Sequence, residues 1–101
     1  ENISQLCEAL DFVLLMTYDY NEKLMTSFGA SLEGNGRDSV AENIQKFINK
    51  NCSASKVVMG ISTYGKLYRL RKSSRSEVGA QGVRLNDVEY HRVREISTIF
   101  D

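Results

Sequence analysis

The stretch that decides the fold covers residues 12–20 and reads Phe-Val-Leu-Leu-Met-Thr-Tyr-Asp-Tyr. Its first five side chains are all apolar, which is typical of a strand buried on both faces, in a parallel sheet that helices cover. Polar groups appear abruptly at Thr17, where we expect the carboxyl end of the strand. A second apolar strand, Lys-Val-Val-Met-Gly-Ile, is predicted at residues 56–61, and a polar and aromatic stretch follows it at residues 62–66.

A helix is predicted between these strands. Ser39 and Glu42 have the spacing of a capping box, and the helix should end near residue 50 or 51. Its apolar stripe consists of Val40, Ile44, Phe47 and Ile48. A strand, a helix and a second strand make a βαβ unit, whose crossover is almost always right-handed. Residues 21–37, which are rich in glycine, predict a long loop, and such loops are often functional.

Two further helices are predicted on either side of this unit. Residues 3–10 carry apolar side chains at helical spacing, with Asn2 as the cap and Gln5 as its reciprocal partner. Residues 67–70 predict an extended segment and residues 73–82 a loop. A last helix is expected after a candidate capping box of Asn86 and Glu89. The residues expected to pack around that helix start and face inward are Leu85, Tyr90, Val93 and Ile96.

Composition excludes several classes of protein. The chain has 101 residues, 13 basic and 13 acidic side chains and a formal net charge of zero, which argues against a dedicated nucleic-acid binder. The longest apolar run, residues 12–16, is far shorter than the roughly 18 residues of a membrane helix. Two cysteines are too few for a disulfide-built miniprotein. Residues 1–4 show no features of a signal peptide, so we expect an internal piece or a mature product.

The two strand ends carry side chains suited to a carbohydrate. In parallel α/β folds, ligands bind at the carboxyl ends of strands. Tyr18 offers an apolar ring and one hydroxyl, and Asp19 offers an anion that accepts hydrogen bonds; sugars present apolar ring faces and hydroxyl edges. The alternative is that Tyr18 and Tyr64 are core residues with satisfied hydroxyls, and spacing alone favours this alternative.

Several segments together resemble one family. Residues 10–20 and 54–66 resemble the sixth and seventh barrel strands of glycoside hydrolase family 18, which contains the chitinases and chitinase-like lectins. Residues 78–80 and 89–96 resemble the start of the small α+β insertion that follows strand seven in many members. The order and the gaps match over nearly the whole chain.

The resemblance implies an α/β fold that is part of a (β/α)8 TIM barrel. Residues 1–65 would be the barrel segment, and residues 66–101 would begin the α+β insertion lobe. A complete barrel needs about 250 residues, so at most two of its eight strands are expected here.

The resemblance also implies roles for five residues. In the family, the tyrosine of a Met-x-Tyr-Asp motif bonds the substrate's acetamido group, and the aspartate holds a sugar hydroxyl. These residues are Tyr18 and Asp19 here, with Met16 lining the subsite floor. A tyrosine and a basic residue after strand seven also line the cleft, and here they are Tyr64 and Lys66. The family usually has arginine at the basic position; lysine keeps the charge but loses the planar, forked donors.

The family's reaction is a retaining hydrolysis of chitin in which the substrate's own acetamido oxygen is the nucleophile. Its general acid is the glutamate of an Asp-x-x-Asp-x-Asp-x-Glu motif on strand four, a spacing absent from this sequence. The chain therefore cannot perform the chemistry alone, and Tyr18 and Asp19 are expected only to assist the substrate. Three hypotheses stay open: part of a chitinase, part of a non-hydrolytic chitooligosaccharide-binding lectin, or a piece without a function of its own.

The implied partners are chitin or N-acetylglucosamine oligosaccharides and the remainder of the barrel, in an extracellular protein. No cofactor, metal, membrane or nucleic acid is expected. His91 is the single histidine and has no cysteine at metal-ligand spacing, so we expect it on a helix surface. A basic run allows a phosphate-binding patch, but zero net charge favours a solvated strand edge and loop. The run consists of Lys66, Arg69, Arg71, Lys72 and Arg75.

Two cysteines and two sequons remain. Cys7 and Cys52 each precede a predicted strand, and the resemblance lets them approach on the far face of the barrel. Sequence cannot set the geometry of a disulfide, so none is predicted. The Asn-x-Ser triplets that begin at Asn2 and Asn51 are glycosylation sequons, which matter only if the chain is secreted.

Overall fold

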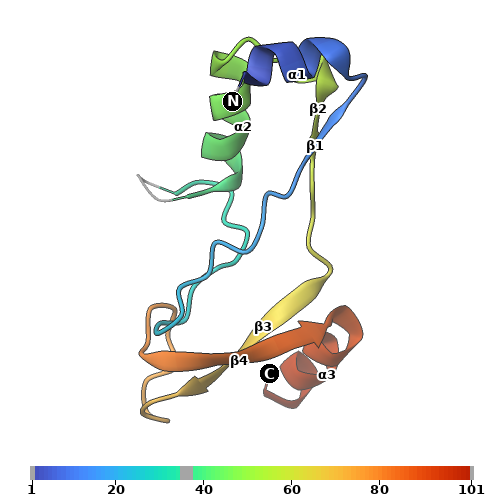
Figure 1. The fold of residues 1–101 in the computed structure, drawn as a ribbon. Coiled ribbons are helices and arrows are strands. Elements are labelled where there is room, and N and C mark those ends of the chain that lie inside the picture. The colour runs from blue at the N-terminus through green and yellow to red at the C-terminus, as the bar shows by residue number, and fades with distance from the viewer. Residues whose placement is uncertain (1, 35–37, 101) are drawn as a thin grey trace. The chain divides into compact units, whose positions relative to one another are not determined.

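The computed structural model describes residues 2–34 and 38–100, which form two compact units (Figure 1). The first unit contains the residues up to Asp19 together with Ala30–Ile61. Its elements are α1 (Ile3–Ala9), β1 (Val13–Leu15), α2 (Val40–Asn49), the 3-10 helix η1 (Ala54–Lys56) and β2 (Val57–Met59). The second unit contains Tyr20–Gly29 and the residues from Ser62 onward. Its elements are β3 (Tyr64–Leu70), β4 (Gly82–Glu89) and α3 (Tyr90–Phe100).

The two helices of the first unit begin where the sequence predicts. The Asn2 side chain accepts a hydrogen bond from the backbone N–H of Gln5 at 3.2 Å, which starts α1. The Ser39 hydroxyl accepts one from the N–H of Glu42 at 3.3 Å, which starts α2. Each bond satisfies an orphan donor of the first turn, a contribution of about 1 kcal/mol. The predicted end of α2 near Lys50 is also confirmed.

The predicted βαβ unit is present. β1 and β2 pair in parallel, with Val13 opposite Val57 and Leu15 opposite Met59, and α2 lies between them along the chain. The core on one side of this sheet is Cys7, Val13 and Cys52. Partly buried side chains that pack against this core are Ile3, Leu15, Phe47 and Val57.

The expectation that the first strand is buried on both faces is wrong for this chain. Val13 is buried, but Leu14 and Met16 are each 77% exposed, and Phe12 before the strand is 63% exposed. Side chains alternate between the two faces of a strand. Val13 and Leu15 meet the core formed with α1 and α2, whereas Leu14 lies on the face that the first unit leaves open.

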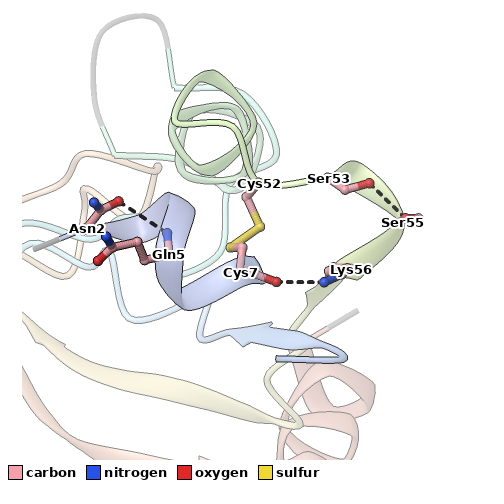
Figure 2. The surroundings of a disulfide bond; sticks show 7 residues. All are labelled: Asn2, Gln5, Cys7, Cys52, Ser53, Ser55 and Lys56. Carbon is pink, nitrogen blue, oxygen red and sulfur yellow. Dashed lines mark hydrogen bonds between the residues drawn. A yellow bond between two sulfur atoms is a disulfide. The ribbon is translucent and has the colours of Figure 1, made fainter. Parts of the chain in front are cut away.

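The expectation that no disulfide forms is also wrong, because Cys7 of α1 bonds to Cys52 after α2 (Figure 2). Packing of α1 against the turn after α2 brings the two Cα atoms to 5.4 Å, and no local sequence pattern encodes this approach. The Lys56 ammonium donates to the carbonyl of Cys7 at 2.8 Å. The first unit is therefore held covalently at the end where β1 and β2 begin.

The second unit is built on an antiparallel pair. β3 pairs with β4 in a register that runs from Tyr64 opposite Glu89 to Leu70 opposite Gly82. The loop at Tyr20–Gly29 lies along β4 and is bonded to its start, because the N–H of Gly82 donates to the carbonyl of Leu24 at 3.0 Å. The Tyr68 hydroxyl donates to the carbonyl of Glu22 at 2.8 Å. This part of the predicted loop is thus tied to the strand pair.

The second predicted capping box does not form. Asn86 and Glu89 belong to β4, since pairing with Leu67 and Tyr64 of β3 competes with local capping. Tyr90 begins α3 and is 63% exposed instead of facing inward.

The inward contact of α3 comes from Val93. This residue is half-buried and packs on Gly65 of β3, where a Cβ atom would lie 2.8 Å from Val93 Cγ2. The Ile96 side chain lies outside the described part of the structure. None of the described helices is long and apolar enough to cross a membrane.

Candidate functional site

Thr17 anchors the chain at the carboxyl end of β1. Its side chain is 1% exposed, and its hydroxyl donates to the carbonyl of Gly60, just past β2, at 2.8 Å. The carbonyl of Leu15 accepts from the N–H of Thr17 at 3.0 Å and from the N–H of Gly60 at 2.8 Å. The ends of the two parallel strands are therefore locked together directly before the predicted site residues. Thr17 thus fixes the backbone next to Tyr18, a structural role that the sequence reasoning did not single out.

Tyr18 is held against Gly60. A Cβ atom at position 60 would lie 3.0 Å from Tyr18 Cε1 and 2.5 Å from the carbonyl oxygen of Leu15, so glycine is needed for this approach. Tyr18 is half-buried. Its exposure therefore lies between that of a buried core tyrosine and that of a tyrosine fully accessible to a ligand, the two alternatives that the sequence leaves open. One part of the ring packs on backbone, and another part remains accessible.

Asp19 turns the chain away from the strand direction. Its φ of 65° lies in the left-handed region, where aspartate is among the few non-glycine residues that occur with any frequency. The side chain is exposed, so the carboxylate lies at the surface beyond β1. Met16, two residues past Leu14, is 77% exposed. The structure thus keeps Met16, Tyr18 and Asp19 together at the carboxyl end of β1 in the first unit.

Tyr64 and Lys66 lie in the second unit, two positions apart on β3 and therefore on the same strand face. The Lys66 ammonium is 4.8 Å from the centroid of the Tyr64 ring, a cation–π contact. It is also 2.7 Å from the Asp87 carboxylate on β4, directly opposite in the register. The Lys66 side chain is only 10% exposed, so its charge is largely balanced by the protein itself.

Asp87 is the charged partner that sequence reasoning missed. It stands next to Asn86, in a stretch that reads locally as a helix start, and only the cross-strand register reveals that it faces Lys66. Arg75, another residue of the basic run, pairs with Glu77 at 3.0 Å. This arrangement supports the solvated edge and loop rather than a phosphate-binding patch.

His91 lies on the surface of the chain. Its side chain is 65% exposed and lies 3.4 Å from Glu89, as expected for a surface residue of a helix. Within residues 2–34 and 38–100, no group of three or more His, Cys, Asp or Glu side chains is arranged to hold a metal ion.

Comparisons with known proteins show the family to which this chain belongs. Residues 1–98 match the family model of glycosyl hydrolases family 18. Chitotriosidase-1 of Mus musculus is 29% identical over an aligned stretch of 87 residues, and the match covers 77% of this chain and 19% of that protein. The chain therefore belongs to glycosyl hydrolases family 18, as the sequence predicts.

Two solved structures define the fold. A family 18 chitinase from Cycas revoluta in complex with (GlcNAc)3 matches with a TM-score of 0.88 and 19% identity over 97% of this chain and 30% of that one. A chitinase-like agglutinin from Robinia pseudoacacia matches with a TM-score of 0.81 and 25% identity over 94% of this chain and 30% of that one. The predicted fold class, a partial (β/α)8 barrel, is confirmed. The chain spans under a third of each solved chain and about a fifth of the mouse relative.

Proposed function

We propose that this chain is the part of a chitinase-like protein that binds N-acetylglucosamine units of chitin through Tyr18 and Asp19. The observation that carries the proposal is the presentation of these two residues directly beyond the carboxyl end of a parallel strand in a family 18 chain. A half-buried tyrosine ring beside an exposed carboxylate offers an apolar surface and a strong acceptor. Those groups match the apolar face and the hydroxyl edge of a sugar.

In this proposal, the Tyr18 hydroxyl donates a hydrogen bond to the acetamido group of the bound sugar, and Asp19 accepts one from a sugar hydroxyl. If the full-length protein is a hydrolase, these bonds orient the acetamido oxygen for attack on the anomeric carbon. Thr17 and Gly60 act indirectly, because they fix the backbone on which Tyr18 and Asp19 stand. Met16 lines the floor beneath the sugar.

Tyr64 and Lys66 are proposed as further sugar contacts. The Lys66 ammonium lies over the Tyr64 ring in a cation–π contact, and it forms an ion pair with Asp87. Lys66 therefore contributes to a sugar site by holding the Tyr64 ring and Asp87 in place more than by donating a free charge. Arginine, with its forked donors, is better suited to hold the Tyr64 ring and Asp87 and to donate to a sugar at the same time.

We also propose that residues 1–65 belong to the barrel and that residues 66–101 begin an α+β insertion. The exposed face of the β1–β2 sheet, with Leu14 and Met16 each 77% exposed, would pack in the full-length protein against the other strands of a (β/α)8 barrel. An extracellular location is proposed as well, and the Cys7–Cys52 disulfide supports it, because disulfides persist mainly in oxidising compartments.

A lectin without hydrolytic activity is the second candidate. The Robinia pseudoacacia agglutinin matches 94% of this chain over 30% of the agglutinin's own length, and the proposed contacts would serve binding without turnover equally well. Turnover requires the general-acid glutamate of the Asp-x-x-Asp-x-Asp-x-Glu motif, which these 101 residues do not contain. Hydrolysis of an N-acetylglucosamine oligomer by the full-length protein would establish the chitinase, and saturable binding without hydrolysis would establish the lectin.

The binding proposal is tested by titration calorimetry of the full-length protein with an N-acetylglucosamine oligomer. Loss of one neutral hydrogen bond in Tyr18→Phe should weaken binding roughly fivefold, which corresponds to about 1 kcal/mol. Loss of a charged acceptor in Asp19→Asn should weaken it roughly 10- to 100-fold. The matched controls Tyr90→Phe and Asp11→Asn alter exposed residues and should leave binding unchanged. Unchanged binding in both test variants would refute the proposal.

A further inference from the structure

The turn after α2 carries a glycosylation sequon, Asn51-Cys52-Ser53. Asn51 follows the helix C-cap with a φ of 63°, and its backbone N–H donates to the carbonyl of Ile48 at 3.0 Å. The Asn51 side chain is exposed, and its amide makes no hydrogen bond to the described part of the chain. The amide nitrogen is therefore available at the surface, whereas the next residue points inward.

The middle residue of the sequon provides a second, independent observation. Cys52 is 2% exposed and is bonded to Cys7 (Figure 2). A disulfide of this kind persists in oxidising compartments such as the lumen of the secretory pathway. Glycosylation of Asn-x-Ser triplets in secreted proteins marks the same route. The bond and the sequon thus point to one cellular environment, although they are separate features of the turn.

We propose that Asn51 carries an N-linked glycan. The donor is an oligosaccharide joined to a lipid through a diphosphate. The Asn51 Nδ2 atom forms a bond to C1 of the first sugar, the bond between C1 and the diphosphate oxygen breaks, and Nδ2 gives up one proton as the lipid diphosphate leaves. The transfer involves no oxidation or reduction.

The position of Asn51 separates this glycan from the proposed sugar-binding residues of the same unit. Asn51 and the disulfide precede β2, whereas Tyr18 and Asp19 follow β1. Because β1 and β2 are parallel, the two groups lie beyond opposite ends of this small sheet. The glycan would cover the surface around α1 and the end of α2, where an open hollow of about 460 Å³ is lined by Asn2, Ile3, Ser4 and Lys50. Its role is to shield this end, so its removal should leave chitooligosaccharide affinity unchanged.

The other sequon, at Asn2, is in a different situation. The Asn2 side-chain oxygen accepts the hydrogen bond that starts α1, and Ser4 is half-buried within that helix. Substitution of Asn2 would therefore mix loss of a helix cap with loss of a sequon. Ser53 allows a cleaner test of the Asn51 site, because its hydroxyl bonds only the exposed Ser55 at 2.9 Å among the described residues.

The experiment uses the full-length protein secreted from eukaryotic cells as wild type, Ser53→Ala and Ser53→Thr. Peptide mass spectrometry before and after treatment with a peptide-N-glycosidase reports on Asn51, which the enzyme converts to aspartate only where a glycan was attached. We expect conversion in the wild type and in Ser53→Thr, which keeps the sequon, and none in Ser53→Ala. Calorimetry should give the same chitooligosaccharide affinity for glycosylated and enzymatically deglycosylated wild type.

An unmodified Asn51 in secreted wild-type protein that contains the Cys7–Cys52 bond would overturn the proposal. The wild-type peptide decides this point even if Ser53→Ala is not secreted. Failure of chitooligosaccharide binding would contradict the proposed function without affecting the result at Asn51. Conversely, an unmodified Asn51 would leave the saccharide-binding proposal intact.

Discussion

Removal of the Cys7–Cys52 disulfide tests how the first unit is held together. The bond joins residues 45 positions apart, and closing a loop of this length in the unfolded chain corresponds to about 4 kcal/mol of stabilisation at 25 °C. The appropriate variant is the double substitution Cys7→Ala and Cys52→Ala. Both sites are only 2% exposed, and alanine avoids burying a hydroxyl group that has no partner.

The helix α1 should respond most strongly. It has 7 residues, fewer than the roughly 12 to 15 that an isolated helix needs to be even marginally stable in water. Cys7 is its one fully buried residue, so α1 depends on the bond and on the core around Val13. Without the disulfide, we expect α1 to open locally before the rest of the unit unfolds.

The assay combines urea unfolding with amide hydrogen exchange on the full-length protein. We expect the double variant to lose about 2–4 kcal/mol of unfolding free energy and to exchange faster in α1 than in α2. Reductant should shift the wild type toward the variant and leave the variant itself unaffected. A loss below about 1 kcal/mol, with α1 still protected, would refute the reasoning, because the bond would then constrain little of the unfolded chain.

Two further substitutions test the contacts around the candidate residues. Thr17→Val keeps the side-chain shape but removes the bond to the Gly60 carbonyl, so urea unfolding should show a loss of about 1–3 kcal/mol; an unchanged midpoint would mean that this bond does not lock the strand ends. Asp87→Asn removes the ion pair of Lys66, whose side chain is 10% exposed, and should cost about 1 kcal/mol after screening at the more exposed Asp87. The control Glu77→Gln breaks a fully surface pair and should cost less than about 0.5 kcal/mol; an equal cost for both would contradict the burial argument.

Features determined by neighbouring residues were predictable from the sequence. Asn2 and Ser39 cap their helices as their types and spacing indicate, because a cap needs only a side-chain oxygen and an N–H two or three residues away. The βαβ unit followed from the order of two apolar runs and one amphipathic helix. Tyr18 and Asp19 were identified at the carboxyl end of β1 because motif and strand end coincide there.

Features determined by distant residues were not predictable in the same way. The Cys7–Cys52 bond depends on the packing of α1 against the turn after α2. Asn86 has the spacing of a helix cap, yet pairing with Leu67 of β3 places it in a strand. For the same reason, no local pattern indicated that Asp87 would face Lys66.

The burial of β1 shows a third limit. Its uninterrupted apolar sequence predicts cover on both faces, but Leu14 is 77% exposed in this chain. The composition of a strand is matched to everything that packs on it in the full-length protein. The apolar sequence of β1 is suited to a strand inside a full barrel. The difference between this expected burial and the observed exposure of Leu14 is the reason for the proposal that other barrel strands cover Leu14.

The central claim is that Tyr18 and Asp19 bind an N-acetylglucosamine unit, and a crystal structure of the full-length protein with an N-acetylglucosamine oligomer tests it most directly. We predict that the Tyr18 hydroxyl lies within about 3 Å of an acetamido oxygen and that an Asp19 carboxylate oxygen lies within about 3 Å of a sugar hydroxyl. An oligomer bound elsewhere, with neither side chain within hydrogen-bond distance of a sugar, would contradict the account.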